Sequence, residues 1–402
     1  MTDQFEIRSL GHLGDGVADG PTYVPFALPG EVVTGERNGD RLENVRILNP
    51  SDDRVKAPCR HFKICGGCVL QHASDQVQRN WRIDQIETAL AQHGVDASVG
   101  KIHVSGIGSR RRVGFVARKT KSGAALCFHR SGSHALVDID ECAVAHNDIV
   151  AQFDGLKEVA KLAATRKAPA KLHVTRAENG LDAAITEACA ISAQDIQILG
   201  RFSELCRVTW NGEIILQKQA PIIFTDSIAI RYPSGAFLQA TMEGQAVMVH
   251  FVKDVLQGAE QIADFFCGCG TFGLALARHS GVIGFENDES TLAAMRTAWT
   301  AANGLKPLEI EHRDLFRSPV LAKNLKLFDA AVLDPPRAGA AAQIAELAQS
   351  DVARIAYVSC NPASFARDAK HLVDAGYTLE RLEAVDQFRW STHIELMSLF
   401  VR

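Results

Sequence analysis

The C-terminal part of the chain alternates short apolar runs with amphipathic stretches, and this pattern limits the available folds more than any other feature. Five runs have the length and composition of buried strands: 261–266, 282–286, 308–312, 329–334 and 355–359. Helical periodicity fills most of the intervals between them. Strands that alternate with helices form an open parallel sheet covered on both faces. The sequence therefore predicts a doubly wound α/β domain over residues 236–402.

The 402 residues are enough for two to four domains, so the preceding part of the chain needs a core of its own. In residues 1–50, strand-forming runs are separated by glycine and proline at regular spacing, which is typical of a small β-barrel. Residues 51–235 mix strand-like and helical segments, so we expect a central α+β domain there. Within it the sequence predicts one helix from Ser74 to Gly94, which we expect to pack on the C-terminal domain.

Composition is that of an ordinary soluble globular protein. Hydrophobic residues make up 47% and charged residues 22%, and no run of about 18 apolar residues predicts a membrane-spanning helix. The first residues lack the basic and apolar regions of a secretory signal, and ten cysteines then favour a reducing cytoplasm. A net charge of −4 predicts no general attraction to nucleic acid, so RNA would have to bind a local basic patch. We expect a monomer.

Cys360 lies where an α/β sheet keeps its reactive groups. The buried run 355–359 continues into Cys-Asn-Pro, and Pro362 has a fixed φ angle that favours a turn. This places Cys360 at the carboxyl end of a strand, where open α/β sheets bind their ligands. A lone cysteine is more often a buried structural residue, but the neighbouring motifs favour a nucleophile.

A glycine-rich turn follows the first predicted strand of this domain. Residues 264–273 read DFFCGCGTFG and match the dinucleotide fingerprint GxGxxG, with Glu286 at the distance expected for a carboxylate that binds a ribose hydroxyl. S-adenosylmethionine needs the same close backbone approach and the same carboxylate. The turn by itself therefore fits both a nicotinamide oxidoreductase and a methyltransferase. Cys267 and Cys269 are too closely spaced for metal ligands, so we expect them in the turn and the core.

Two further motifs favour methyl transfer to carbon. Asp334-Pro-Pro-Arg337 follows a predicted strand, and its prolines make a rigid turn without backbone donors, suited to framing a flat base. Methyltransferases that act on exocyclic amines have an aromatic residue where Arg337 stands, which argues for carbon chemistry. Glu395 is a carboxylate in a mostly apolar strand, and such a group is seldom buried without a role.

Together these residues predict one reaction. C5 of uracil is too weak a nucleophile to take a methyl group from a sulfonium unaided, but a thiolate that adds to C6 makes C5 nucleophilic. A base must then remove the C5 proton before the thiol can leave. Cys360 and Glu395 fit these two roles.

Three cysteines close together predict a metal-binding loop. Cys59, Cys65 and Cys68 lie within ten residues, and two glycines between them let the backbone fold around a ligand. A four-thiolate site needs one more ligand, for which Cys142 is the first choice and Cys127 the second. The uneven spacing with a remote fourth thiol favours an iron–sulfur cluster, although zinc would use the same thiols.

A basic stretch in the central segment is the candidate RNA contact. Residues 110–130 hold seven Lys or Arg residues and no acid, and strand alternation would put Arg110 and Arg112 on one face. Such a stretch is suited to phosphates. On charge alone, a basic edge strand that resists pairing with other strands explains it equally well.

In combination these motifs resemble the bacterial RNA uracil-5-methyltransferase family, and within it the 23S rRNA enzymes that have an iron–sulfur cluster and an N-terminal TRAM domain. The resemblance covers essentially the whole chain. It rests on six motifs: CRHFKICGGC (59–68), FLQ (237–239), DFFCGCG (264–270), DPPRAG (334–339), SCNP (359–362) and HIE (393–395).

The resemblance implies a fold, a reaction and its cofactors. It implies an oligonucleotide-binding-like barrel, a central domain with an iron–sulfur loop, and a Rossmann-like domain that methylates C5 of a uridine in 23S rRNA. Cys360 would be the nucleophile and Glu395 the base. The S-adenosyl-L-methionine site would consist of Gln239, Phe266, Thr271, Glu286, Asp314 and Asp334. A [4Fe-4S] cluster would be bound by Cys59, Cys65, Cys68 and Cys142. RNA would contact Arg110, Arg111, Arg112 and Arg130.

The chain departs from the family pattern at three places. The family usually has Asn where Thr271 stands, Val-Asn where Ala240-Thr241 follows Gln239, and Pro where Ala143 follows Cys142. None of these positions is Cys360 or Glu395, so the reaction class is unaffected.

Three alternatives stay open at this point. The first is a tRNA uracil-5-methyltransferase, although the tRNA enzymes of the family commonly lack both the thiol triad and the barrel. The second is an iron–sulfur nicotinamide oxidoreductase, and the third is a non-catalytic RNA-binding protein. The oxidoreductase leaves Cys360 and the Asp334-Pro-Pro-Arg turn without a role. A non-catalytic protein would be expected to have lost Cys360 or Glu395, and both are present.

Overall fold

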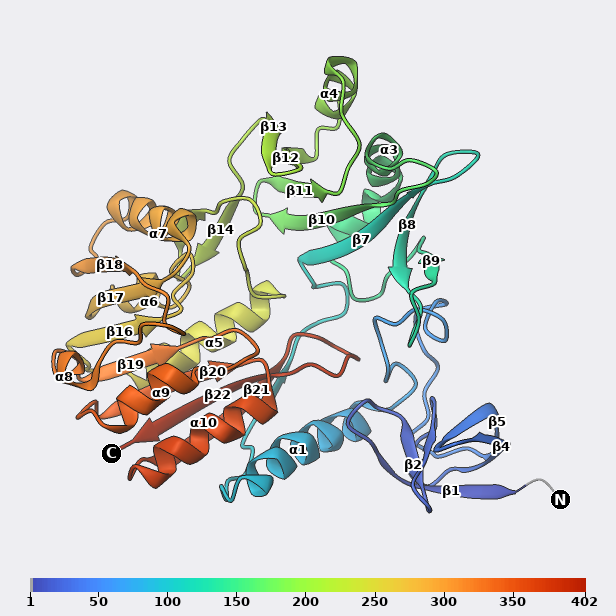
Figure 1. The fold of residues 1–402 in the computed structure, drawn as a ribbon, viewed down its shortest axis with the longest axis horizontal. Helices are drawn as coiled ribbons and strands as arrows, with labels where there is room; N and C mark the ends of the chain where they lie inside the picture. The colour runs from blue at the N-terminus through green and yellow to red at the C-terminus, as the bar shows by residue number, and fades with distance from the viewer. Residues whose placement is uncertain (1–2) are drawn as a thin grey trace.

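The computed structural model describes residues 3–402, so Met1 and Thr2 of the predicted barrel lie outside it. Figure 1 shows three parts: a small barrel near the N-terminus in blue, a central sheet in green, and a larger sheet with helices in yellow to red. Among residues 3–402, no helix combines the length and the apolar composition needed to span a bilayer.

The barrel consists of five short strands, as the glycine and proline spacing predicts. The strands close in the order β1-β2-β3-β5-β4. Their bounds are Gln4–Leu10, Gly16–Ala18, Thr22–Val24, Val32–Asn38 and Arg41–Asn49 for β1 to β5. Ile7, Val24 and Leu42 fill the interior. A side chain at Gly16 would meet the carbonyl oxygen of Ala27 at 3.0 Å, so this close approach requires glycine.

A seven-stranded sheet forms the core of the central part, in the order β13-β12-β11-β10-β7-β8-β9. Its strands are β7 (Arg112–Lys119), β8 (Ala124–His129), β9 (Leu136–Asp138), β10 (Ala170–Ala177), β11 (Gly180–Thr186), β12 (Leu205–Trp210) and β13 (Glu213–Gln217). Three helices belong to this part: α2 (Asn147–Ala151), α3 (Phe153–Ala163) and α4 (Ala193–Gly200). Leu156 and Val159 of α3 pack on the apolar face of β7 and β8. A separate hairpin follows, of β14 (Ile222–Thr225) and β15 (Ile228–Arg231).

The C-terminal part is built on an eight-stranded sheet in the order β18-β17-β16-β19-β20-β22-β21-β6. Its strands are β6 (Ile102–Val104), β16 (Gln261–Phe265), β17 (Gly281–Glu286), β18 (Leu308–His312), β19 (Ala330–Leu333), β20 (Arg354–Ser359), β21 (Thr378–Asp386) and β22 (Glu395–Val401). The strands β16 to β20 are parallel to one another, which confirms the predicted α/β core.

Two strands depart from the prediction. β22 pairs antiparallel with both β20 and β21, so the sheet is mixed and not purely parallel. β6 pairs with β21, although the sequence assigns residues 51–235 to a central domain. The predicted boundary at residue 235 therefore does not hold for β6, because a three-residue strand has too little pattern of its own to reveal which sheet it joins.

The predicted helix 74–94 is α1 (Asp75–Gln92), and it packs on the C-terminal part. The Ser74 side chain caps its first turn, and Gly94 just beyond its end has a φ of +71°, as the start and stop signals predict. Ile86 and Leu90 share one apolar cluster with Phe365 of α10 (Pro362–Asp374). Figure 1 shows the two helices side by side.

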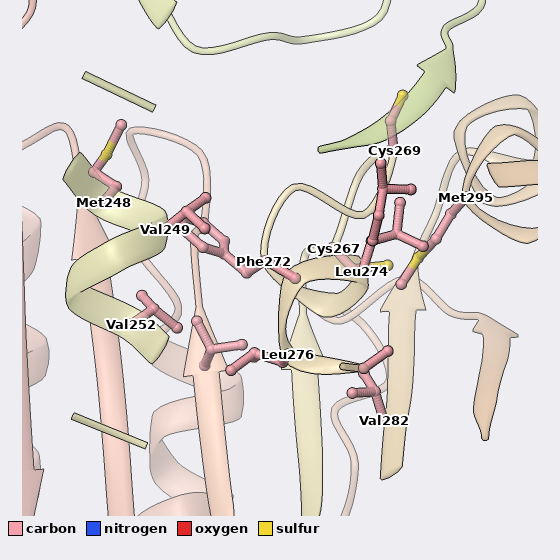
Figure 2. Packing of buried hydrophobic residues seen from close by; sticks show 14 of the residues in the cluster. Met248, Val249, Val252, Cys267, Cys269, Phe272, Leu274, Leu276, Val282 and Met295 are labelled. Carbon is pink, nitrogen blue, oxygen red and sulfur yellow. The ribbon is translucent and has the colours of Figure 1, made fainter. Parts of the chain in front are cut away.

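The other helices cover the faces of this sheet: α5 (Met242–Val255), α6 (Gly273–Leu276), α7 (Glu289–Ala301), α8 (Ala322–Leu325) and α9 (Ala341–Ala348). Figure 2 shows Met248 and Val252 of α5 packing in one cluster with Leu276 of α6. Cys267 and Cys269 lie in the same cluster and are 5% and 3% exposed. They are core residues, as the sequence predicts.

The strand order reverses at the centre of the sheet. β17 and β18 lie on one side of β16, whereas β19 and β20 lie on the other. The connections that leave β16 and β19 therefore diverge, and open α/β sheets bind ligands at the carboxyl ends of such a strand pair.

Candidate active site

Five predicted site residues meet at the carboxyl edge of the sheet. Phe266 follows β16, Glu286 ends β17, Asp334 follows β19 and Cys360 follows β20. Glu395 reaches the same edge because β22 is antiparallel to β20 and begins there. All five side chains line one cavity of about 510 Å³. The remaining predicted cofactor residues line it as well: Gln239, Thr271 and Asp314.

Cys360 lies in a turn that is hydrogen-bonded to the Asp334-Pro-Pro-Arg turn. The side chain of Asn361 accepts a hydrogen bond from Ala363 N–H at 3.2 Å, which caps α10, and its Nδ2 donates to the carbonyl oxygen of Arg337 at 2.9 Å. Ser364 Oγ donates to the same carbonyl at 3.1 Å. The Asp-Pro-Pro-Arg turn is thereby held against the Cys360 turn. The sequence analysis missed this role of Asn361, although Asn before Pro is a helix-start signal.

The environment of Cys360 keeps its thiol protonated at neutral pH. The pKa of the thiol is raised to about 11, chiefly by burial and also by the carboxyl groups of Glu395 and Asp334, although the guanidinium of Arg337 acts to lower it. Since only the thiolate is a strong nucleophile, a proton must leave Cys360 before it can react.

Glu395 has the properties of a base that works near neutral pH. It is 2% exposed, and burial, together with the nearby carboxyl of Asp334, raises its pKa to about 8. Gln387 Nε2 donates a hydrogen bond to Glu395 Oε1 at 3.1 Å and lowers that pKa. The sequence analysis missed Gln387. Its position directly after an apolar strand was the available signal, because a buried amide needs partners for all its polar atoms.

The glycine-rich turn leaves its backbone open toward the cavity. Phe266 has a φ of +60°, a left-handed conformation that costs about 1–3 kcal/mol for a non-glycine residue. At Gly268 an added Cβ would meet no atom within 4 Å, and the residue lines the cavity. At Gly270 a Cβ would lie 2.6 Å from the Met295 side chain, so the turn packs too tightly for any other residue. A ligand can therefore approach the backbone closely here.

Carboxylates and aromatic rings surround this turn. Glu286 accepts a hydrogen bond from Gly268 N–H at 3.1 Å, and Asp314 accepts one from Phe316 N–H at 3.0 Å. The rings of Phe266 and Phe316 have centroids 5.5 Å apart. Oriented carboxylates suit ribose hydroxyls and aromatic faces suit an adenine. The residues present therefore fit the S-adenosylmethionine that the family resemblance implies.

Gln239 connects the segment before α5 to the strand tips. Its Nε2 donates to Asp334 Oδ2 at 2.9 Å, and its Oε1 accepts from Gln387 Nε2 at 2.8 Å. Desolvation raises the pKa of Asp334 to about 7, while the hydrogen bond from Gln239 lowers it. Gln387 thus links the predicted cofactor residue Gln239 to the predicted base.

The basic stretch is placed differently from the prediction. Arg111 is 1% exposed, and its guanidinium donates to the Gln239 carbonyl at 2.8 Å and to Gln245 Oε1 at 2.6 Å. The prediction that Arg111 contacts RNA is therefore wrong, because its charged group is enclosed by the protein. Arg112 donates to the Leu238 carbonyl at 2.9 Å. Both arginines hold the segment that carries Gln239.

Replacing Arg111 by alanine is expected to lower the free energy of unfolding by about 2–4 kcal/mol, because a buried carbonyl and a buried amide oxygen lose their donor. Chemical denaturation of the purified protein measures this change. Arg118, exposed on β7 just beyond Arg111, is the matched control, and Arg118→Ala should cost less than about 0.5 kcal/mol. Equal losses for the two variants would contradict the assignment.

Arg110 and Arg130 keep the positions expected of RNA contacts. The Arg110 guanidinium lies over the Phe388 ring, 5.2 Å from its centroid, and Arg130 is exposed. Both line a second cavity of about 510 Å³ beside the active site. His393 belongs to its lining too, and lies 3.4 Å from Arg337 of the first cavity. RNA contact by these residues stays a prediction.

The second cavity is also lined by the four thiols predicted to bind a cluster: Cys59, Cys65, Cys68 and Cys142. Three of them come from the loop between β5 and α1, and the fourth comes from the loop after β9. Burial raises the pKa of each of the three loop thiols, and the charge of Cys142 raises it further, so the four groups lie within electrostatic reach of one another. The alternative ligand Cys127 is buried in β8, outside this lining.

The thiols are not arranged for a single metal ion. Within residues 3–402, no three His, Cys, Asp or Glu side chains lie close enough together to hold one. A four-iron cluster separates its thiolates more widely, because irons and sulfides lie between them. Cys65 Sγ and Cys142 Sγ each accept a backbone N–H at 3.4 Å. Cluster binding by these four thiols stays a prediction.

Comparisons with known proteins identify the family and agree with the fold. A family model for tRNA (uracil-5-)-methyltransferases matches residues 173–402. An uncharacterized RNA methyltransferase of Brucella suis biovar 1 is 42% identical over 100% of this chain and 98% of the relative. The 23S rRNA (uracil(1939)-C(5))-methyltransferase RlmD of a Shewanella species is 31% identical over 98% of this chain and 95% of the relative.

A solved structure shares the fold along the whole chain. The Pyrococcus abyssi tRNA (uracil-54, C5)-methyltransferase, in complex with S-adenosyl-L-homocysteine, matches with a TM-score of 0.78. The match covers 99% of this chain and 100% of that one at 24% identity, which speaks for the fold alone. The family model covers more than half of the chain, and both relatives align with nearly all of it. The chain therefore belongs to the tRNA (uracil-5-)-methyltransferase family of RNA-modifying enzymes.

Proposed function

We propose that this protein transfers a methyl group from S-adenosylmethionine to C5 of a uridine in 23S rRNA. The observation that carries the proposal is the single cavity in which Cys360, Asp334 and Glu395 lie beside an open glycine turn. The choice of 23S rRNA rests on the RlmD relative, whose name states that substrate. The barrel does not strengthen this choice, because a tRNA enzyme shares the fold over 99% of the chain.

In the proposed reaction Cys360 activates the uracil ring. Cys360 releases its proton to solvent, its thiolate adds to C6 of the uracil, and the electron pair of the C5–C6 double bond moves toward C5 and O4. Arg337 favours this step, because its positive charge lowers the pKa of the thiol. The cofactor, when bound, supplies an electrophilic methyl group on a sulfonium, which C5 then takes.

Glu395 completes the reaction. After methyl transfer C5 carries both the methyl group and its original proton. Glu395 takes that proton, the electron pair restores the C5–C6 double bond, and Cys360 leaves as the thiolate. A base with a pKa of about 8 is ionised often enough at neutral pH to accept the proton.

The cluster is part of the proposal. We assign Cys59, Cys65, Cys68 and Cys142 as the ligands of a [4Fe-4S] cluster, since all four line the cavity beside the active site. Bound there, a cluster would hold the loop before α1 against the loop after β9. No catalytic step depends on it.

Replacing Cys142 by serine is expected to lower bound iron from about four atoms per chain to less than about one, because a cubane cluster needs four anionic ligands. Protein purified without oxygen is assayed for iron and acid-labile sulfide. Cys127→Ser is the matched control and should retain the full content, since Cys127 lies outside the cavity lining. Equal iron in both variants would remove Cys142 from the ligand set.

The test of the function is a methyl-transfer assay. Protein with its cluster is mixed with labelled S-adenosylmethionine and unmodified 23S rRNA or tRNA, and the labelled nucleoside is identified. We expect 5-methyluridine in 23S rRNA. Label in tRNA alone would keep the reaction and replace the substrate. No label in either RNA would overturn the proposal.

A further inference from the structure

Gln387 lies between the predicted base Glu395 and the predicted cofactor residue Gln239. It follows β21 directly and is 1% exposed, and it is not among the residues that line the cavity. Its Oε1 accepts hydrogen bonds from Ala240 N–H at 2.9 Å and Thr241 N–H at 3.3 Å. A backbone N–H can only donate, so the atom that faces it must be the amide oxygen. These two contacts therefore fix which way the Gln387 amide points.

The fixed amide presents both of its N–H groups to the site. Gln387 Nε2 donates to Glu395 Oε1 at 3.1 Å and to Gln239 Oε1 at 2.8 Å. Since Gln239 must offer its oxygen to this donor, its own Nε2 faces Asp334 Oδ2, at 2.9 Å. The two backbone N–H groups thus fix the orientation of the Gln387 amide, and this amide fixes the orientation of the Gln239 amide. Each amide donates to one carboxylate, Glu395 or Asp334.

We propose that Gln387 is a positioning residue, which holds Glu395 in place as the ionised base and sets the amide orientation of Gln239 at the same time. This inference rests on the methyltransferase function proposed above. It adds a residue that couples the proton-removal step to the cofactor side of the cavity.

The surroundings of Glu395 explain why one donor matters. The ionisable groups that face it are the carboxyl of Asp334 and the thiol of Cys360, and both disfavour a second negative charge. Among the residues that the structure describes, Gln387 is the one side chain that donates a hydrogen bond to this carboxylate. It therefore opposes the effects of burial and of Asp334 on the ionised form. It binds Oε1 and leaves Oε2 for the proton.

The segment that carries Gln239 is anchored from its other side as well. The Arg111 guanidinium donates to the Gln239 carbonyl, and the Arg111 backbone N–H donates to the Ala240 carbonyl at 2.9 Å. The backbone that orients Gln387 is therefore itself held in place. This rigidity lets the amide orientation act as a fixed property of the site.

Gln387→Glu is the direct test, because it keeps the size and the acceptor oxygen while it replaces the donor by a second acceptor. Single-turnover reactions are quenched between pH 6 and 9.5, and the decay of the covalent Cys360–RNA adduct is followed on denaturing gels. The pH midpoint of adduct decay is expected to rise by about 1–2 units, as for the loss of a hydrogen bond to a charged group. Calorimetry should show S-adenosylmethionine binding about 10-fold more weakly, through the displaced Gln239.

Two further variants separate positioning from folding. Gln387→Met removes the donor without adding a charge, and it should raise the midpoint in the same direction by a smaller amount; it also serves if Gln387→Glu does not fold. Gln343 is the matched control, a buried glutamine remote from the site whose amide bonds the Val320 backbone. Gln343→Glu should lower stability and leave the midpoint unchanged.

The outcomes are distinguishable. If the unaltered protein methylates its RNA but the Gln387 variants keep its pH midpoint and its cofactor affinity, the positioning role is overturned and the proposed function stands. If the unaltered protein forms neither adduct nor methylated RNA, the proposed function itself fails. A rise in the midpoint for Gln387→Glu and not for Gln343→Glu supports the role.

Discussion

Replacement of Cys360 by serine is expected to lower methyl transfer by at least about 10⁴-fold, because the reaction as proposed cannot begin without addition to C6. A serine hydroxyl has a far higher pKa than a thiol, so it supplies almost no anion at the same position. The variant should still bind RNA and S-adenosylmethionine, since Cys360 contributes to neither fold nor charge. The loss of methyl transfer is measured as turnover with labelled cofactor. The loss of the covalent adduct is measured on a denaturing gel.

Cys189 provides the control for this experiment. It is half-buried in the central part, where its thiol donates to the Leu162 carbonyl at 3.0 Å, and it lies in neither cavity lining. Cys189→Ser should retain full turnover. Appreciable methylation by the Cys360→Ser protein would instead show that another group adds to C6, or that none does.

Replacement of Glu395 by glutamine is expected to trap the covalent adduct after methyl transfer. The amide cannot take the C5 proton, so the double bond is not restored and Cys360 stays bonded to C6; release should slow by about 10²–10⁴-fold. Labelled methyl groups should then remain on a protein–RNA species that survives denaturation. Such label on the adduct also shows that transfer precedes proton removal.

The pH dependence of the unaltered protein gives an independent check. Burial raises the pKa of Glu395 to about 8, so the fraction of ionised base increases as pH rises through that value. Release should accelerate from pH 6 to 9 with a midpoint near 8, whereas the Glu395→Gln protein should show no such rise. The control for Glu395→Gln is Glu383→Gln, at a carboxylate on β21 that is paired with Arg381 and His103. Normal adduct release by Glu395→Gln would refute the base assignment.

Local sequence signals predicted much of this protein. Most strands and helices of the C-terminal part, the start of α1 at Ser74 and the barrel of residues 4–49 follow from periodicity, caps and turn residues, whereas β6 and β21 were not predicted. These signals involve residues close together in the chain, so the sequence carries them directly. Cys360 could be placed at a strand tip for the same reason.

The prediction from sequence was wrong where charged side chains were assumed to be exposed. Three consecutive arginines indicated a surface strand, but Arg111 is enclosed because a segment 128 residues further along supplies carbonyl and amide acceptors for it. A buried arginine is tolerated only with such partners. No residue near Arg111 in the sequence indicates that these partners exist.

The sequence by itself determined the local elements and the chemistry of the individual groups, namely a thiol, a carboxylate and a glycine turn after strands. The tertiary structure alone decided which groups meet. Glu395 reaches the site because β22 runs antiparallel to β20, and Gln387 orients both Glu395 and Gln239 because β21 ends beside the segment before α5. Hydrogen bonds of this kind join residues far apart in the chain. Their geometry depends on the packing of the whole sheet, which no local pattern encodes.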